Sequence, residues 1–367
     1  MNRAFQVTDG ISSECLLNSQ VPATFLLLMI VAILTTNSTT ARGQELRIVP
    51  AEPWSTAFAG EELRLAVRVT SVDDADGAVP KGRLQWSHSF NRRTISSGEA
   101  ELQADNNGSA TAELVLKPAT VRDGVIIATR VTADLVDAQG KATDTRFEQT
   151  LWLFPSDPLT GRSEWAKSLQ IELFDPVGRT AKLLDDLQLP YQLIHHVGAP
   201  DATQQKSILI IAEDVSLVRN RALSDQMLQA AMAGRRVLVL APADGGIVLP
   251  GMDDRDDADS ALPGEIRFAR QTVITELDKR LDASAWLGAG PTVPFHGLRM
   301  GSRRGRIEAS VSLRSTAWPW LRIGYPQTGG ALIFCGFRVI EHAHHGPTPR
   351  YLLIRILESL SDSHDEQ

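Results

Sequence analysis

Residues 169–194 read LQIELFDPVGRTAKLLDDLQLPYQLI, and the pattern of this stretch changes twice. The apolar run Leu169–Phe174 predicts a strand, and Tyr191–Ile194 predicts a second one. Between them, the turn DPVG leads into GRTAKLLDDLQLP, which predicts a helix. Strand, helix and strand in succession are typical of a sheet with parallel strands.

The same alternation continues towards the carboxyl terminus. Ser207–Ala212 (SILIIA) is an apolar run of the kind buried on both faces of a parallel sheet. A helix over ALSDQMLQAAMAGR is expected to end at Gly234, before the strand RRVLVLAP. After an acidic surface loop at 244–261, strands are expected at 311–313, 320–323 and 331–337, and a closing helix at 351–360. These elements predict an α/β three-layer domain over 165–360 and a polar tail at 361–367.

The preceding residues, 44–155, show a different pattern, with period two. Seven short alternating segments are separated by turn residues such as Asn106-Asn107-Gly108. In one of them Leu63, Leu65 and Val67 alternate with charged or small residues, so one face is expected to point inward. About seven strands without a helix predict an immunoglobulin-like β-sandwich, with Trp86 in its core.

Residues 21–36, VPATFLLLMIVAILTT, form the long apolar run of the chain. Its uninterrupted core has ten residues, fewer than the roughly 20 that a membrane-spanning helix needs. The run therefore resembles a signal peptide, with cleavage after Gly43. The segment before it lacks the usual positive charge, so either the true start differs or the run is an uncut signal anchor within residues 1–43. A signal peptide or an anchor predicts an exported protein, periplasmic or extracellular, or one held on the membrane by residues 21–36. A buried core helix is the remaining alternative, and the polar residues 37–42 beside the run disfavour it.

Composition excludes some classes of protein. The chain has 367 residues and a formal net charge of -7, which argues against a general nucleic-acid binder. Its two cysteines are Cys15, in the amino-terminal segment, and Cys335, so the chain after Gly43 cannot form an internal disulfide.

Several phrases of the second half resemble class I glutamine amidotransferase-like domains. They are LFDPVGRTAKLLDDLQLPYQLI, SILIIAED, AAMAGRRVLVLAP and the late GGALIFCGF with RYLLIRILESL. The resemblance covers roughly 165–360. Within the family, this region is most similar to the domains that follow an immunoglobulin-like sandwich in large exported bacterial glycosidase-related proteins. The resemblance implies a flavodoxin-like fold for this region.

The chain departs from this family at its catalytic position. Working members carry a nucleophilic cysteine just after the strand equivalent to Arg236–Leu240, where this sequence reads Ala-Pro-Ala-Asp. The chain also lacks a Gly-x-Cys-x-Gly or Gly-x-Ser-x-Gly motif. Without a nucleophile, acyl transfer by that route cannot occur, so the sequence favours a protein that is not an enzyme.

Four acidic residues follow predicted strands: Asp175, Glu213, Asp214 and Asp244. In open α/β sheets, the carboxyl ends of the strands form the edge where ligands bind. Such carboxylates could hold Mg²⁺ or Ca²⁺, or act as an acid/base pair. The favoured alternative is that Asp175 caps the following helix and the others are solvated loop acids.

Three further groups are candidates for binding. Gly178 and Arg179 at a helix start could hold an anion, although helix entry explains them equally well. His342, His344 and His345 lie near Cys335, but they lack the ligand spacing of a zinc site, and a buried inert thiol is the usual state of such a cysteine. Trp318 and Trp320 could form a sugar-binding platform, although a buried hairpin pair is favoured.

The sequence thus predicts a β-sandwich followed by a three-layer α/β domain, and a non-catalytic binding or scaffold function. The expected partner is a glycan or an envelope protein, without a cofactor, and with no nucleic acid. The alternative is a glycan-related hydrolase that uses Asp175, Glu213 and Asp244, with or without a metal ion.

Overall fold

The computed structural model of the chain describes residues 45–72, 81–105, 108–198, 207–249, 265–269, 273–281, 286, 299–302, 308–310 and 320–361. Residues Gln44–Gln367 belong to one compact unit.

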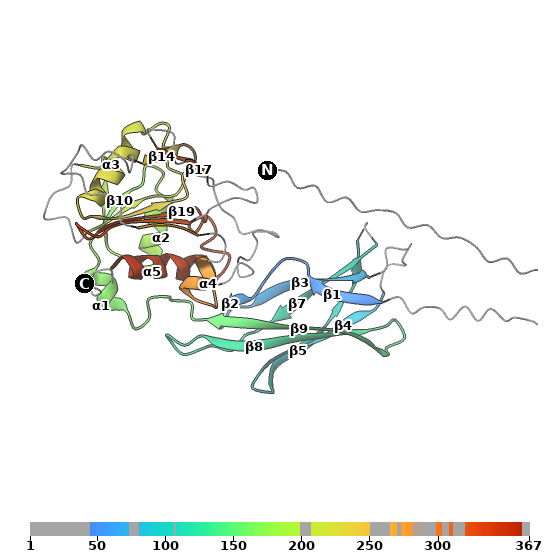
Figure 1. Ribbon diagram of the computed structural model, residues 1–367. Coiled ribbons are helices and arrows are strands. Elements are labelled where there is room, and N and C mark those ends of the chain that lie inside the picture. The colour runs from blue at the N-terminus through green and yellow to red at the C-terminus, as the bar shows by residue number, and fades with distance from the viewer. Residues whose placement is uncertain are drawn as a thin grey trace, which may run out of the picture. The chain divides into compact units, whose positions relative to one another are not determined.

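Alternating side chains build two sheets from the first half of this unit (Figure 1). In β3 (Leu63–Ser71), Leu65 and Val67 are buried, whereas Arg68 is exposed. The four-stranded sheet has the order β1 (Leu46–Pro50), β3, β7 (Ala110–Leu116), β6 (Gln103–Ala104). The five-stranded sheet has the order β2 (Thr56–Phe58), β9 (Ala142–Phe154), β8 (Ile127–Val136), β4 (Arg83–Phe90), β5 (Arg93–Glu101).

The two sheets share one hydrophobic core. Trp54 is 1% exposed and meets Phe147 edge-on, with ring centroids 5.8 Å apart. Trp86 on β4 is buried as predicted and packs over Gly98 of β5, where an added Cβ would lie 2.8 Å from the indole ring. The first half is therefore a two-sheet β-structure, and each of the seven predicted strand segments overlaps one of its strands.

The second half is built on a seven-stranded mixed sheet. Its order is β11 (Tyr191–Ile194), β10 (Ile171–Phe174), β12 (Ile208–Ile211), β13 (Arg236–Leu240), β19 (Gly330–Cys335), β18 (Trp320–Tyr325), β15 (Glu265–Ala269). The first five strands run parallel, and β18 and β15 are antiparallel to their neighbours. All residues of β12 and β13 are buried, as expected of interior parallel strands.

Two helices connect neighbouring parallel strands. Helix α2 (Arg179–Asp186) joins β10 to β11 and buries Leu183 and Leu184. Helix α3 (Arg221–Met232) joins β12 to β13, and its end comes so close to β19 that a Cβ on Gly330 would lie 1.9 Å from the carbonyl oxygen of Ala231. A glycine is required there because any side chain would overlap the helix backbone.

The remaining described elements complete the chain. They are α1 (Ser163–Ser168), α4 (Val273–Leu277), α5 (Pro347–Ser361, red in Figure 1) and a three-stranded sheet of β14 (Gly246–Leu249), β16 (Arg299–Ser302) and β17 (Glu308–Ser310).

The predicted fold class is wrong. Strands make up 42% of the structure and helices 19%. In the described part of the chain the strands form several sheets, without a three-layer flavodoxin-like arrangement. That arrangement requires parallel strands alternating with helices. Between β13 and β19 the chain instead forms strands of a separate small sheet and the antiparallel strands β15 and β18. The alternation of strands and helices over 169–240 therefore does not continue to residue 360, as the prediction required. The segment 244–261, which was predicted to be a loop, contains β14.

Candidate functional site

The predicted acidic residues follow β10, β12 and β13, which are adjacent and parallel. Their carboxyl ends consequently lie at one edge of the large sheet, here called the carboxyl edge. The structure gives each of the four carboxylates hydrogen-bond partners within the protein.

Asp175 organises the start of α2. The residue is 7% exposed, and its Oδ1 accepts hydrogen bonds from the backbone N–H groups of Gly178 (2.8 Å) and Val177 (3.2 Å). Its Oδ2 accepts a third bond from the N–H of Ala181, at 2.8 Å. Gly178 has a φ of +83°, a left-handed conformation that favours glycine. Both residues therefore act in turning the chain from strand to helix.

Glu213 is the most deeply buried of the four acids, with 1% exposure. Its two carboxylate oxygens accept hydrogen bonds from the backbone N–H groups of Ile340 (2.9 Å) and Glu341 (3.0 Å). Burial raises the pKa of Glu213 to about 7, although these two bonds and the charge of Arg338 act in the opposite direction. The carboxyl group thus titrates near neutral pH while holding the segment after β19.

Asp214 links two arginines. Its φ is +65°, which is uncommon for a residue with a side chain. Oδ2 lies 2.8 Å from Nη1 of Arg179, and Oδ1 lies 3.0 Å from Nη2 of Arg338. Arg338 also forms an ion pair with Glu341. Arg179, a predicted anion ligand, is therefore paired with a carboxylate of the protein.

Asp244 joins two loops at the same edge. Its Oδ1 lies 2.5 Å from Oγ of Ser216 and accepts a bond from the N–H of Val218 at 3.2 Å. Its carbonyl oxygen accepts a bond from the N–H of Leu217. The loop after β12 is thereby fixed to the loop after β13.

The histidines and Cys335 do not form a cluster suited to a metal ion. The rings of His342 and His345 have centroids 5.3 Å apart, and His344 lies beside Arg350. Across the described ranges, no group of three or more His, Cys, Asp or Glu side chains is placed to hold a metal. Burial raises the pKa of the Cys335 thiol to about 12, which makes it a poor nucleophile.

The predicted tryptophan platform is only partly described. Trp320 lies in β18 with 6% exposure, so its ring is packed in the core and not presented to solvent. Trp318 lies outside the described residues. The indole ring of Trp320 is therefore not available for stacking on a sugar ring. It is buried because β18 is an interior strand of the large sheet.

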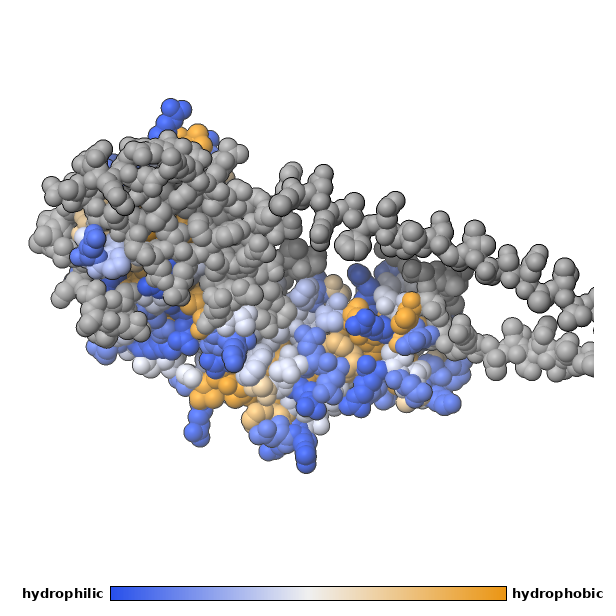
Figure 2. Space-filling view, viewed as in Figure 1, coloured by the Kyte–Doolittle hydropathy of each residue, from blue (hydrophilic) through white to orange (hydrophobic). Residues whose placement is uncertain are grey.

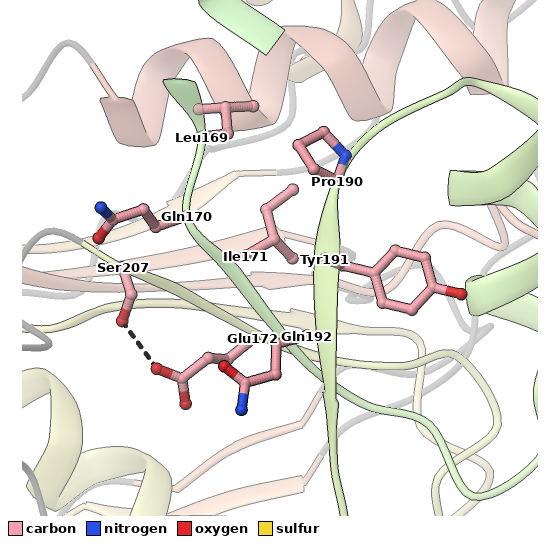
Figure 3. A pocket seen from close by; sticks show the side chains of 8 residues that line it. All are labelled: Leu169, Gln170, Ile171, Glu172, Pro190, Tyr191, Gln192 and Ser207. Atoms are coloured by element: carbon pink, nitrogen blue, oxygen red, sulfur yellow. Dashed lines mark hydrogen bonds between the residues drawn. The ribbon is translucent and has the colours of Figure 1, made fainter. Parts of the chain in front are cut away.

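Sequence reasoning missed a cavity at the opposite end of the strands. It has a volume of about 330 Å³ and lies where β10, β11 and β12 begin, here called the amino edge (Figure 3). Its lining consists of Leu169, Gln170, Ile171, Glu172, Pro190, Tyr191, Gln192 and Ser207. The signal available in the sequence was Glu172, a charged residue within an otherwise apolar strand.

A buried ion pair stands behind this cavity. Nη2 of Arg235 lies 3.1 Å from Oε2 of Glu172, and their side chains are 1% and 15% exposed. Ser207 Oγ donates a hydrogen bond to Oε1 of Glu172 at 3.2 Å, drawn dashed in Figure 3, and accepts one from Arg235 at 3.1 Å. The carboxylate of Glu172 is therefore held in one orientation.

Among the residues with described burial, few large apolar side chains are exposed. They are Val72, Phe90, Val125, Val177, Leu193 and Val218. On the face shown in Figure 2, the hydrophobic patches are small and bordered by hydrophilic side chains. Such scattered apolar side chains are normal for a protein surface.

Comparison with known proteins does not assign the chain to a family. No family model and no curated protein matches it. Among solved structures, the sporulation control protein Spo0M from Bacillus subtilis matches at 15% identity and a TM-score of 0.21, covering 33% of this chain and 54% of that one. CopC from Methylosinus trichosporium OB3b matches at 15% identity and a TM-score of 0.20, covering 30% and 96%.

A third similar structure is the CARDB domain of a protein from Pyrococcus furiosus. It shows 10% identity and a TM-score of 0.20, and it covers 30% of this chain and 85% of that one. The chain spans about half the length of Spo0M, and TM-scores near 0.2 give no support to a specific function. The amidotransferase-like resemblance stays a prediction.

The amino-terminal apolar run, 21–36, lies outside the described residues. Of the helices in the described part of the chain, none is long and apolar enough to span a membrane.

Proposed function

We propose that this chain is an exported, non-catalytic binding protein whose immunoglobulin-like first half accompanies a binding second half, with a glycan as ligand or an envelope protein as partner. The observation that supports the non-catalytic part is that the acids at the carboxyl edge are already bonded to other groups of the protein. Asp175 accepts three backbone hydrogen bonds, and Glu213 accepts two. Asp214 pairs with two arginines. These bonds are the kind that hold loops in place.

A hydrolase is the second candidate function, and the titration of Glu213 favours it. A carboxyl group with a pKa of about 7 suits a general acid at neutral pH. Against this candidate, Glu213 is 1% exposed and both its oxygens are bonded to backbone N–H groups. A general acid must come within hydrogen-bond reach of the substrate.

Binding of the full chain to an array of bacterial and plant polysaccharides tests the proposal, with hydrolysis products measured in the same wells. Saturable binding without products is the expected result. Products that form with the natural chain and vanish with Glu213→Gln would overturn the non-catalytic proposal. If the chain binds no polysaccharide of the array, the glycan ligand is refuted. The remaining partner is then an envelope protein, and a cross-linked pull-down from an envelope extract would have to recover it.

Export is tested by the mass and location of the mature chain. A product that begins at Gln44 outside the cytoplasm is expected if residues 1–43 are a signal peptide. An intact chain in the membrane fraction would indicate the signal anchor instead. An intact chain in the cytosol would contradict export by either route.

A further inference from the structure

The strand register places four polar side chains in a row at the amino edge. Glu172 pairs with Gln192 across β10 and β11, and Ile171 pairs with Ile208 across β10 and β12. Ser207 therefore lies beside Gln170, one position before Ile208, and Arg235 lies beside Ser207 for the same reason. Because side chains alternate between the faces of a sheet, Gln192, Glu172, Ser207 and Arg235 share one face.

The charge of this row is balanced within the protein. Arg235 is 1% exposed and reaches the cavity only through Glu172 and Ser207. The ion pair therefore presents carboxylate oxygens that are already paired with a cation and retain further acceptor capacity. A neutral ligand that donates hydrogen bonds suits these oxygens, whereas a second anion would be repelled by them.

The rest of the lining adds adaptable polar groups and apolar contact. Gln170 and Gln192 are exposed, and within the described part of the chain their side-chain amides have no hydrogen-bond partner. Each amide offers both a donor and an acceptor. Pro190 is exposed and supplies apolar contact, whereas Leu169 and Ile171 are buried and point to the opposite face of the sheet from Glu172 (Figure 3).

We infer that the amino-edge cavity binds a neutral sugar residue. Adjacent hydroxyl groups of a sugar can donate to Glu172 and exchange hydrogen bonds with Gln170 and Gln192. Its C–H groups can pack against Pro190. The volume of about 330 Å³ is at the lower end of the range of small-molecule pockets, about 300–1,000 Å³. This inference deepens the proposed function, on whose glycan ligand it rests.

Saturation-transfer NMR on the full chain tests the site with four probes: methyl glucoside, methyl mannoside, methyl galactoside and N-acetylglucosamine. At least one probe is expected to bind with a millimolar Kd. Gln192→Ala is expected to weaken this binding about fivefold, the equivalent of one neutral hydrogen bond. Gln170→Ala provides a second, independent variant, and both positions are exposed, so neither change disturbs the core.

Two controls sharpen the result. Gln229→Ala removes an exposed glutamine from α3, outside the cavity, and should leave the Kd unchanged. Methyl glucuronide should bind more weakly than methyl glucoside because its carboxylate faces that of Glu172. Tighter binding of the glucuronide would overturn the neutral-ligand inference.

The outcomes separate this inference from the proposed function. If a polysaccharide binds but Gln170→Ala and Gln192→Ala leave its affinity unchanged, the amino-edge site is refuted and the glycan function stands. If no polysaccharide and no probe binds, the amino-edge site and the glycan ligand are refuted together, and the proposed function is left with an envelope protein as its partner.

Discussion

The two ends of the parallel strands differ in how their polar groups are used. At the carboxyl edge, Asp175, Glu213 and Asp244 bond to backbone N–H groups of loops. At the amino edge, Glu172 bonds to the side chains of Arg235 and Ser207, next to a cavity. The usual ligand edge of an α/β sheet is thus occupied by the protein's own loops. Acidic residues at strand ends are consequently weak indicators of a site until their partners are known.

The largest expected effect comes from breaking the ion pair of the amino edge. Glu172→Ala leaves the guanidinium of Arg235 buried without its carboxylate, and the expected loss is about 3 kcal/mol of unfolding free energy. Urea unfolding, followed by circular dichroism, measures the change. Glu164→Ala is the matched control, because that glutamate is 88% exposed in its ion pair with Lys167 and should change little. A loss below about 1 kcal/mol for Glu172→Ala would mean that the pair does not hold this edge.

The second prediction concerns the titration of Glu213 at the carboxyl edge. Its pKa is higher in the folded chain, about 7, than the usual value of 4.5, so folding favours the protonated carboxyl. The resulting stabilisation is complete below about pH 4.5 and is lost as the pH rises through about 7. Glu213→Gln cannot ionise, so the natural chain should lose up to about 3 kcal/mol relative to this variant over that interval.

Unfolding free energies of both proteins at a series of pH values check this prediction. Other titrating groups are common to the two chains and cancel in the difference. Parallel curves between pH 4.5 and 7 would show that Glu213 ionises normally, which would remove the observation that favours the hydrolase.

The contrast between the edges also shows what the sequence could predict. Strand positions followed from local alternation, and the turn after β10 already indicated that Asp175 caps a helix, because its partners lie within six residues. The partners of Glu213 could not be predicted, since Ile340 lies 127 residues further along the chain. A strand was predicted at 320–323, where β18 lies, but its antiparallel direction was not, because a single strand carries no signal of its direction. The strand β15 was not predicted.

The grouping of polar side chains at the amino edge also depends on contacts between distant segments, here on the register of the strands. Glu172, Ser207 and Arg235 come from three separate segments, and only the pairing of β10, β12 and β13 brings them together. A charged side chain in the middle of an apolar strand was the one local signal, since burying it requires a partner. The sequence did not identify which arginine would be that partner.

The smallest effects separate the acids of the carboxyl edge from one another. Asp175→Asn replaces one oxygen by an NH₂ group that cannot accept a hydrogen bond, so either the N–H of Ala181 or those of Gly178 and Val177 lose their acceptor. The expected loss is about 1–2 kcal/mol of unfolding free energy.

In Asp244→Asn the remaining amide oxygen can still accept the bonds from Ser216 and Val218. Asp244 is also exposed, so the expected loss is below about 0.5 kcal/mol. Urea unfolding of both variants at pH 7 decides the order, and a larger loss at Asp244 would mean that the tie between the two loops, rather than the cap of α2, holds this edge together.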